Sequence, residues 1–216
     1  MASRREITEA AAALFRERGY HRTSMADIAR RVGLLKGSLY YHIESKEEIL
    51  FEILDGFIDL LIAKTEARAA APAPDQVVRL EGMIADFLEI IRDYTNELTI
   101  FFNERRNLSG ARWERINAKR ARFGALLLDA IRAGQREGSL RADLDPTIVM
   151  LGMFGMVNWA IYWLKPEGRL SLSEIASILS RILFDGLRAP ARPASPTRRR
   201  KTSPARAGSA RRATRA

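Results

Sequence analysis

Apolar residues recur along most of the chain at the spacing of an α-helix, and strand-like alternation is nearly absent. Over residues 4–19 they lie three and four positions apart, which places one set on a single helical face: Ile7, Ala10, Ala11, Leu14 and Phe15. Ser3 is placed to cap the start of this helix, and Gly19 to end it in a left-handed conformation. The pattern predicts an all-α protein.

Glycines, prolines and capping residues divide the chain into about nine predicted helices. Two short helices follow the first, and a long one starts after Ser45, whose spacing to Glu48 is typical of a capping box. Asp145 followed by Pro146 is a favoured beginning for a later helix. The predicted helices after the first cover residues 25–32, 35–43, 46–70, 76–94, part of 96–108, 109–137, 146–164 and 171–188.

The composition limits the chemistry that the chain can perform. It has 216 residues with no cysteine and two histidines, which excludes disulfides and cysteine-based metal sites and makes a histidine-rich metal centre unexpected. Gly-rich phosphate loops, the Gly-x-Ser-x-Gly elbow and the His-Glu-x-x-His pattern do not occur. We therefore expect no metal, no cofactor and no catalytic residue, and hence no enzyme. No secretory signal is evident, so a cytoplasmic protein is expected.

Positive charge is unevenly distributed over three expected parts of the chain. Residues 189–216 contain nine Lys or Arg and no acid, and so account for +9 of the formal net charge of +10. They contain no large apolar residue and are expected to be disordered. Residues 1–46 carry nine basic and five acidic groups. We expect a DNA-binding domain over 1–46, a helical body over 47–188 and a basic tail over 189–216.

Residues 24–43, SMADIARRVGLLKGSLYYHI, have the spacing of a helix-turn-helix. Ile28 and Val32 face inward from the first helix, Gly33 makes the turn, and Leu39 anchors the second helix. In such units the second helix enters the major groove, and neighbouring polar groups bind phosphate. The expected DNA contacts are Thr23, Ser24, Lys36, Gly37, Ser38, Tyr40, Tyr41, His42 and Lys46.

The segment from Phe15 to Leu50 resembles the DNA-binding head of TetR/AcrR-type repressors. The matching features are Phe-x-x-x-Gly-Tyr followed by Thr-Ser, then Ile-Ala, Val-Gly, Gly-Ser-Leu-Tyr-Tyr-His and Ser-Lys-Glu-Glu-Ile-Leu. Ile43 departs from the pattern, since an aromatic residue is more usual there. The resemblance implies a homodimer whose two heads bind successive major grooves of a palindrome. It also implies a small molecule in each C-terminal domain that moves the heads apart.

Residues 146–164 form a long apolar run that approaches the length of a membrane span. The neighbouring helices are amphipathic, so we interpret the run as a helix buried at a subunit interface rather than in a membrane. The resemblance implies that helices 146–164 and 171–188 pair with the same helices of a second subunit in a homodimer.

The alternative to a ligand-responsive repressor is a nucleoid-type protein that coats DNA and relies on its basic tail. Such a protein needs no apolar body large enough to hold an effector.

The central helices supply the residues expected to line an apolar effector cavity. They are Phe87, Leu88, Ile91, Phe101, Phe102, Phe123, Leu127, Met153 and Trp159. Arg105 and Arg106, with a row at Arg112, Arg115, Arg120 and Arg122, would form a basic mouth. Ordinary core packing and a solvated charged face are the alternatives for these two sets. Together they fit an amphiphile with an anionic head, such as an acyl-CoA. Residues 101–123 and 162–176 are also similar to repressors of fatty-acid and sterol catabolism that respond to CoA thioesters.

Overall fold

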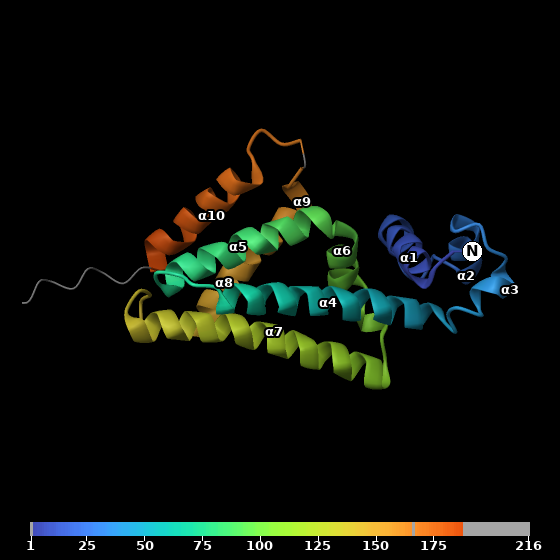
Figure 1. Cartoon of the computed structure of the whole chain (residues 1–216), viewed down its shortest axis with the longest axis horizontal. Helices are drawn as coiled ribbons and strands as arrows, with labels where there is room; N and C mark the ends of the chain where they lie inside the picture. Colours follow the sequence, from blue (N-terminus) through green and yellow to red (C-terminus); the bar gives the residue numbers. More distant parts are fainter. Residues whose placement is uncertain (1, 166, 188–216) are drawn as a thin grey trace, which may run out of the picture.

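The computed structural model describes residues 2–165 and 167–187, and all regular secondary structure in this part of the chain is helical. Figure 1 shows an elongated molecule with a small head at one end and a larger body. The head contains α1 (Arg4–Arg18), α2 (Met25–Arg31) and α3 (Lys36–Leu39). The predicted all-α fold is confirmed. The basic segment 189–216 and its predicted disorder lie outside the described residues.

One long helix, α4, joins the head to the body, and α7 lies along it while α5 packs on another side (Figure 1). Two elements, α6 and the 3₁₀ turn η1, lie where the body meets the head, and α10 packs along α5. The elements of the body are α4 (Lys46–Ala70), α5 (Gln76–Asp93), α6 (Thr95–Asn103), η1 (Arg105–Asn107), α7 (Gly110–Glu137), α8 (Pro146–Asn158), α9 (Ala160–Trp163) and α10 (Leu172–Leu187).

The helix boundaries follow the capping residues. Ser3 forms a complete capping box with Glu6, and the Asp145 carboxylate accepts the first free N–H groups of α8. The box expected at Ser45 is half formed, because the Glu48 carboxylate accepts from the N–H of Glu44 instead. A helix end thus needs only one of the two reciprocal bonds.

Two predicted helices are divided or shortened in the structure. The helix expected over 35–43 is α-helical only to Leu39, because Tyr40, Tyr41 and His42 donate their N–H groups to carbonyls three residues back. The helix expected over 146–164 is interrupted at Trp159, where the Tyr162 N–H also bonds three residues back. This interruption explains why the described residues contain ten α-helical segments instead of about nine.

Candidate functional site

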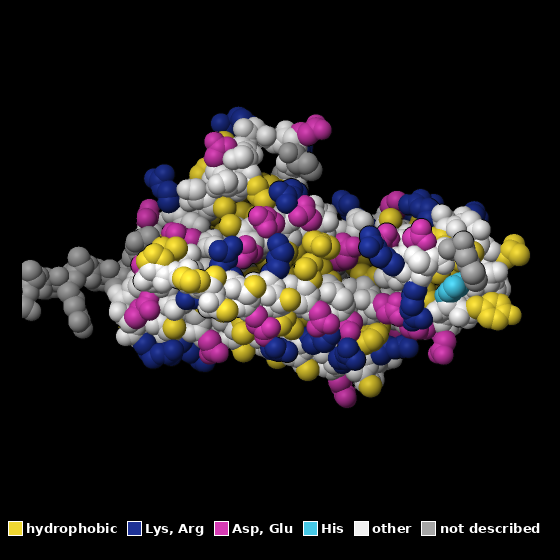
Figure 2. Space-filling view, viewed as in Figure 1, with side chains coloured by type: hydrophobic (Ala, Val, Ile, Leu, Met, Phe, Trp, Pro, Cys, Tyr) yellow, Lys and Arg dark blue, Asp and Glu magenta, His cyan; other side chains and the backbone are white. Residues whose placement is uncertain are grey.

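The end of the molecule that carries α3 presents large side chains to solvent. Tyr41 is 91% exposed and Leu35, the residue before α3, is 80% exposed. Figure 2 shows hydrophobic side chains projecting at this end of the molecule. Lys36 and Gly37 are also exposed, and Tyr40 is half-exposed. Five neighbouring residues are therefore available to one partner surface.

Two of the expected DNA contacts instead hold the head together. Thr23 is 1% exposed, and its hydroxyl donates to the carbonyl oxygens of Leu14 at 3.3 Å and Gly19 at 3.0 Å. The Lys46 ammonium donates to the carbonyl oxygens of Tyr20 at 2.7 Å and Thr23 at 2.8 Å. It lies 4.3 Å from the centre of the Tyr20 ring, and burial lowers its pKa. The expectation is corrected for these two side chains, because buried carbonyls recruit them inward.

Of three other expected contacts, Ser24 is exposed but caps a helix, and two are half-buried. The Ser24 hydroxyl donates to the Asp27 carboxylate at 2.6 Å and caps α2, and this bond lowers the pKa of Asp27. Ser38 and His42 are half-buried, and the His42 Nε2 atom is buried without a hydrogen-bond partner among the described residues. Their expected roles on DNA stay predictions.

Polar bonds join the head to α6 and the residue after it at two places. The Glu104 carboxylate, between α6 and η1, accepts from the backbone N–H of Tyr20 at 3.2 Å. Arg16 on α1 donates to the Asn96 side chain on α6 at 2.8 Å. Because α6 also contributes to the cavities of the body, these bonds connect the cavity wall directly to the head.

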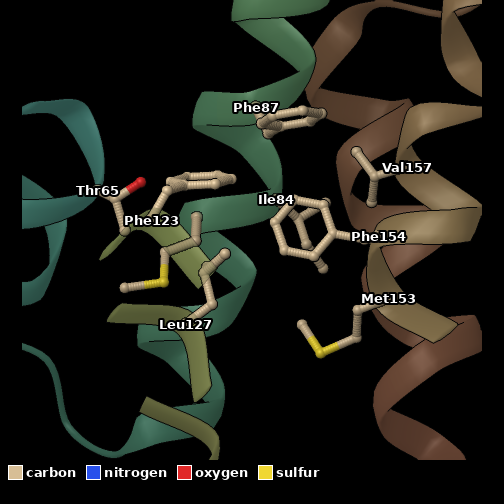
Figure 3. Close-up of a pocket in the computed structure, with 9 residues that line it drawn as sticks. Thr65, Ile84, Phe87, Phe123, Leu127, Met153, Phe154 and Val157 are labelled. Atoms are coloured by element: carbon tan, nitrogen blue, oxygen red, sulfur yellow. The ribbon is translucent and has the colours of Figure 1, made fainter. Parts of the chain in front are cut away.

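The first cavity, the apolar chamber, lies between α4, α5, α7 and α8 and has a volume of about 40 Å³, within about 380 Å³ of empty space that includes open solvent (Figure 3). Its only polar group is the Thr65 hydroxyl, which donates to the carbonyl oxygen of Leu61 at 2.8 Å. The lining residues are Thr65, Met83, Ile84, Phe87, Phe123, Leu127, Met153, Phe154 and Val157. Such a wall suits hydrocarbon.

The second cavity, the Arg120 chamber, has about 630 Å³ of empty space, part of it open to solvent. Its polar side chains are Arg120 and Asn158, and the Oδ1 atom of Asn158 is buried without a hydrogen-bond partner among the described residues. The lining residues are Ile58, Leu61, Phe87, Leu98, Phe101, Phe102, Arg120, Phe123, Gly124, Met150, Phe154 and Asn158. Three aromatic residues line both chambers: Phe87, Phe123 and Phe154.

Only some of the residues that the sequence assigned to a cavity line one in the structure. Six of them line one or both chambers: Phe87, Phe101, Phe102, Phe123, Leu127 and Met153. Ile91 and Leu88 are core residues outside both linings. Trp159 is 63% exposed and packs on Tyr162, 4.7 Å between ring centres, so its expected place in the cavity is corrected. The break in the helix at Trp159 turns its side chain outward.

Arginines converge beside the Arg120 chamber. Arg105 donates to the carbonyl oxygens of Phe101 at 3.2 Å and Phe102 at 2.9 Å, while its Nε is buried without a partner among the described residues. Burial lowers the pKa of Arg105, and the nearby charges of Arg120 and Arg106 lower it further. This local excess of positive charge suits an anion.

The other arginines expected at this mouth lie elsewhere. Arg115 on α7 pairs with Asp55 on α4 at 2.8 Å, and Arg112 approaches Glu47 at 3.8 Å. Arg122 pairs with Glu66. Figure 2 shows basic and acidic side chains interspersed over α4 and α7. These arginines form a network between two helices rather than a basic mouth.

The last helices, α8 to α10, carry a set of exposed large apolar side chains, the apolar face. Its exposed members are Ile148, Leu151, Trp159, Tyr162, Trp163, Ile178 and Ile182. By length and composition the segment Pro146–Trp163 is apolar enough to cross a membrane, with 17% of that window buried. Its inner side packs against α5 and α7, as a helix of a protein body does. The large exposed face therefore marks an interaction surface.

Two protein-family descriptions match most of the chain. Residues 7–53 match "Bacterial regulatory proteins, tetR family", and residues 73–187 match "Tetracyclin repressor-like, C-terminal domain". The repressor KstR2 of Rhodococcus jostii is 32% identical over 188 residues, which cover 87% of this chain and 92% of that protein.

Solved structures give the same result. The ketosteroid transcriptional regulator KstR2 of Mycobacterium tuberculosis matches with a TM-score of 0.80 at 31% identity, over 88% of this chain and 96% of that chain. AibR, solved in complex with isovaleryl coenzyme A and operator DNA, matches with a TM-score of 0.76 at 33% identity, over 84% of this chain and 97% of that chain. The family consists of transcriptional regulators, not enzymes. The chain belongs to the TetR family of bacterial transcriptional regulators.

Proposed function

We propose that the protein is a ligand-responsive repressor that binds a palindromic operator as a homodimer and is released from it by an amphiphilic effector. The observation that carries this proposal is the pairing, within one chain, of an exposed α3 end with a two-chamber cavity, joined through Glu104. A regulator of this kind needs two distinct sites and a physical connection between them. It would act in the cytoplasm, where its operator lies.

The DNA contacts in this proposal come from the exposed residues at α3. Lys36 pairs with phosphate, the small Gly37 allows close approach of the backbone, and the Tyr40 and Tyr41 hydroxyls bond phosphate or base edges. Leu35 adds an apolar contact for the 5-methyl group of thymine. Thr23 and Lys46 support this surface from within the head.

The apolar face of α8, α9 and α10 is the proposed homodimer interface. It combines exposed aliphatic and aromatic side chains with Gly152 and Gly155, beside which there is open space for a second chain to approach. Pairing would remove this apolar surface from water. It would also set the separation of two α3 helices on DNA.

The proposed effector is an acyl-CoA. The apolar lining of the first chamber suits a hydrocarbon tail that displaces its side chains, and the cluster of Arg105, Arg106 and Arg120 suits the anionic groups of coenzyme A. The isovaleryl coenzyme A bound to AibR supports this class of ligand. The other arginines of α7, Arg112, Arg115 and Arg122, already pair with acidic side chains. We therefore place the anionic groups at Arg105, Arg106 and Arg120.

Selection of DNA sequences by the purified protein, followed by footprinting, tests the DNA-binding proposal. One short palindrome is expected, whereas uniform coverage would favour the alternative of a DNA-coating protein. Addition of acyl-CoAs, with free coenzyme A and free fatty acids as controls, then tests the effector proposal. Release by the thioesters alone supports it, and the absence of release or direct binding by any thioester contradicts it.

A further inference from the structure

Three aromatic side chains border both chambers, and Phe154 packs against the other two. Phe154 on α8 lies edge-on to Phe87, with ring centres 5.7 Å apart and an interplanar angle of 88°. It also lies edge-on to Phe123, at 5.5 Å and 70°. Figure 3 shows the Phe154 side chain extending from α8 toward α5. All three rings belong to the walls of both chambers, so together they form the partition.

The chambers on either side of this partition differ in chemistry. The apolar chamber offers only the Thr65 hydroxyl, whose proton is already donated to Leu61. The Arg120 chamber holds the Arg120 guanidinium and the Asn158 carboxamide, which have room to bind polar groups. A molecule that occupied both would have its polar part on one side of Phe154 and its hydrocarbon part on the other.

Phe154 is the member of the partition that can move most easily. Phe154 and Phe123 are both half-buried, whereas Phe87 is buried in the body. Phe154 belongs to α8, a helix of 13 residues that ends at the break before α9, whereas Phe123 belongs to the 28-residue α7, which packs along α4. Rotation of this one ring would join the chambers without a change in the main chain.

We propose that Phe154 sets the length of the hydrocarbon tail that the effector can have. This inference rests on the proposed response to acyl-CoA and adds which tail lengths the protein prefers. Short tails end at the ring within the Arg120 chamber, and longer tails bind only by displacing the ring and entering the apolar chamber. Each methylene that enters the apolar chamber raises affinity by about fourfold.

The test compares Phe154→Ala with the full-length parent protein over a series of straight-chain acyl-CoAs of increasing tail length. Direct binding by calorimetry and release of operator DNA are both measured. Phe154→Ala is expected to shift the preferred tail length upward, so that a tail longer by two methylenes gains about 15-fold relative to the parent protein. Phe102→Ala removes the same type of ring from the rim of the Arg120 chamber alone, and it should weaken all thioesters alike.

Phe154→Leu, which keeps more of the packing, provides a second measurement if Phe154→Ala unfolds. An unchanged length profile in both Phe154 variants, or an equal shift in Phe102→Ala, overturns the inference while the effector proposal stands. If the parent protein binds no thioester of any length, the effector proposal itself is wrong. Calorimetry on the parent protein therefore separates the two failures.

Discussion

The carboxylate of Glu104, beside the cavity wall, accepts a hydrogen bond from the backbone N–H of Tyr20 in the head at 3.2 Å. The same side chain accepts from the Asn107 amide at 2.8 Å, which fixes its direction. A change in the position of α6 therefore reaches the head through the Arg16–Asn96 bond and through this one. The bond is local enough to be removed without touching either candidate binding surface.

Glu104→Ala is expected to weaken the coupling between effector and DNA. Binding of effector alone and of operator alone should change little, while the ratio of DNA affinities without and with effector falls by about fivefold. Fluorescence anisotropy of labelled operator at saturating effector measures this ratio. Glu66→Ala, which removes the ion pair to Arg122 within the body, is the control and should leave the ratio as in the parent protein.

Lys46 and Lys36 are expected to act differently although both are lysines near α3. Lys46→Met leaves the carbonyls of Tyr20 and Thr23 without their donor, at a cost of about 2 kcal/mol, and lowers the Tm by about 6 °C. Lys36→Ala should leave the Tm unchanged and reduce the salt dependence of DNA binding by about one unit of slope per protomer. Thermal melts and anisotropy titrations over a range of salt distinguish them; equal salt slopes for both variants would contradict this assignment.

Leu35 is expected to recognise thymine. Replacing the contacted thymidine of each half-site with deoxyuridine removes only a methyl group and should weaken the parent protein by about fourfold per half-site. Leu35→Ala should bind both operators with equal affinity, because its short side chain cannot reach the methyl group. If Leu35→Ala keeps the parent's preference for thymine, the contact is made by another residue.

Arg105 is expected to bind the anionic part of the effector. Its guanidinium is partly buried, with one N–H free of partners among the described residues, so loss of a charged hydrogen bond should weaken an acyl-CoA by about tenfold or more. Arg105→Met should still bind the matching thioester of N-acetylcysteamine, which has the same tail but no phosphates. Arg122→Met is the matched control, since Arg122 pairs with Glu66 away from the chambers. Calorimetry with both thioesters checks the difference.

Ile182→Glu is expected to dissociate the homodimer. Ile182 is 60% exposed on α10 and belongs to the apolar face, so a carboxylate there would be buried next to its own copy or a neighbour. Light scattering should show a monomer. The affinity for the operator should fall, because a monomer has one head and binds only one of the two half-sites. Ala67→Glu, an exposed position on α4, is the control and should stay dimeric. A dimeric Ile182→Glu protein would place the interface elsewhere.

Much of the architecture follows from local pattern. Ser3, Gly19 and Asp145 mark helix ends in the sequence, and the structure uses all three. The head is predictable because Ile28, Leu39 and their neighbours occur at a spacing that few other folds require. The break at Trp159 could not be predicted, since the residues around it form an uninterrupted apolar helix pattern and no proline or charge marks it.

The functional residues were harder to predict, because the same residue type can bind other groups of the protein at one position and face solvent or a cavity at another. Nothing local distinguishes Lys46, which binds carbonyls, from Lys36, which faces solvent; the difference depends on where the loop at 19–23 folds back. Arg115 and Arg120 are five residues apart on one helix, and only the position of Asp55 on α4 decides which is paired. Phe154 and Asn158 were missed because a helix that is apolar on all sides does not reveal which face lines a cavity.

The continuity of α4 has a mechanical consequence. It is a single helix of 25 residues, and at 1.5 Å per residue it spans about 37 Å, with its first residue bound to the head and its far end just past the cavity-lining Thr65. Pivoting such a rod by about 5° about its cavity end displaces Lys46 by about 3 Å, close to the rise of one base pair. A change of angle that is too small to disturb the packing of the core thus becomes, through the length of α4, a displacement of the head along the operator of about one base pair.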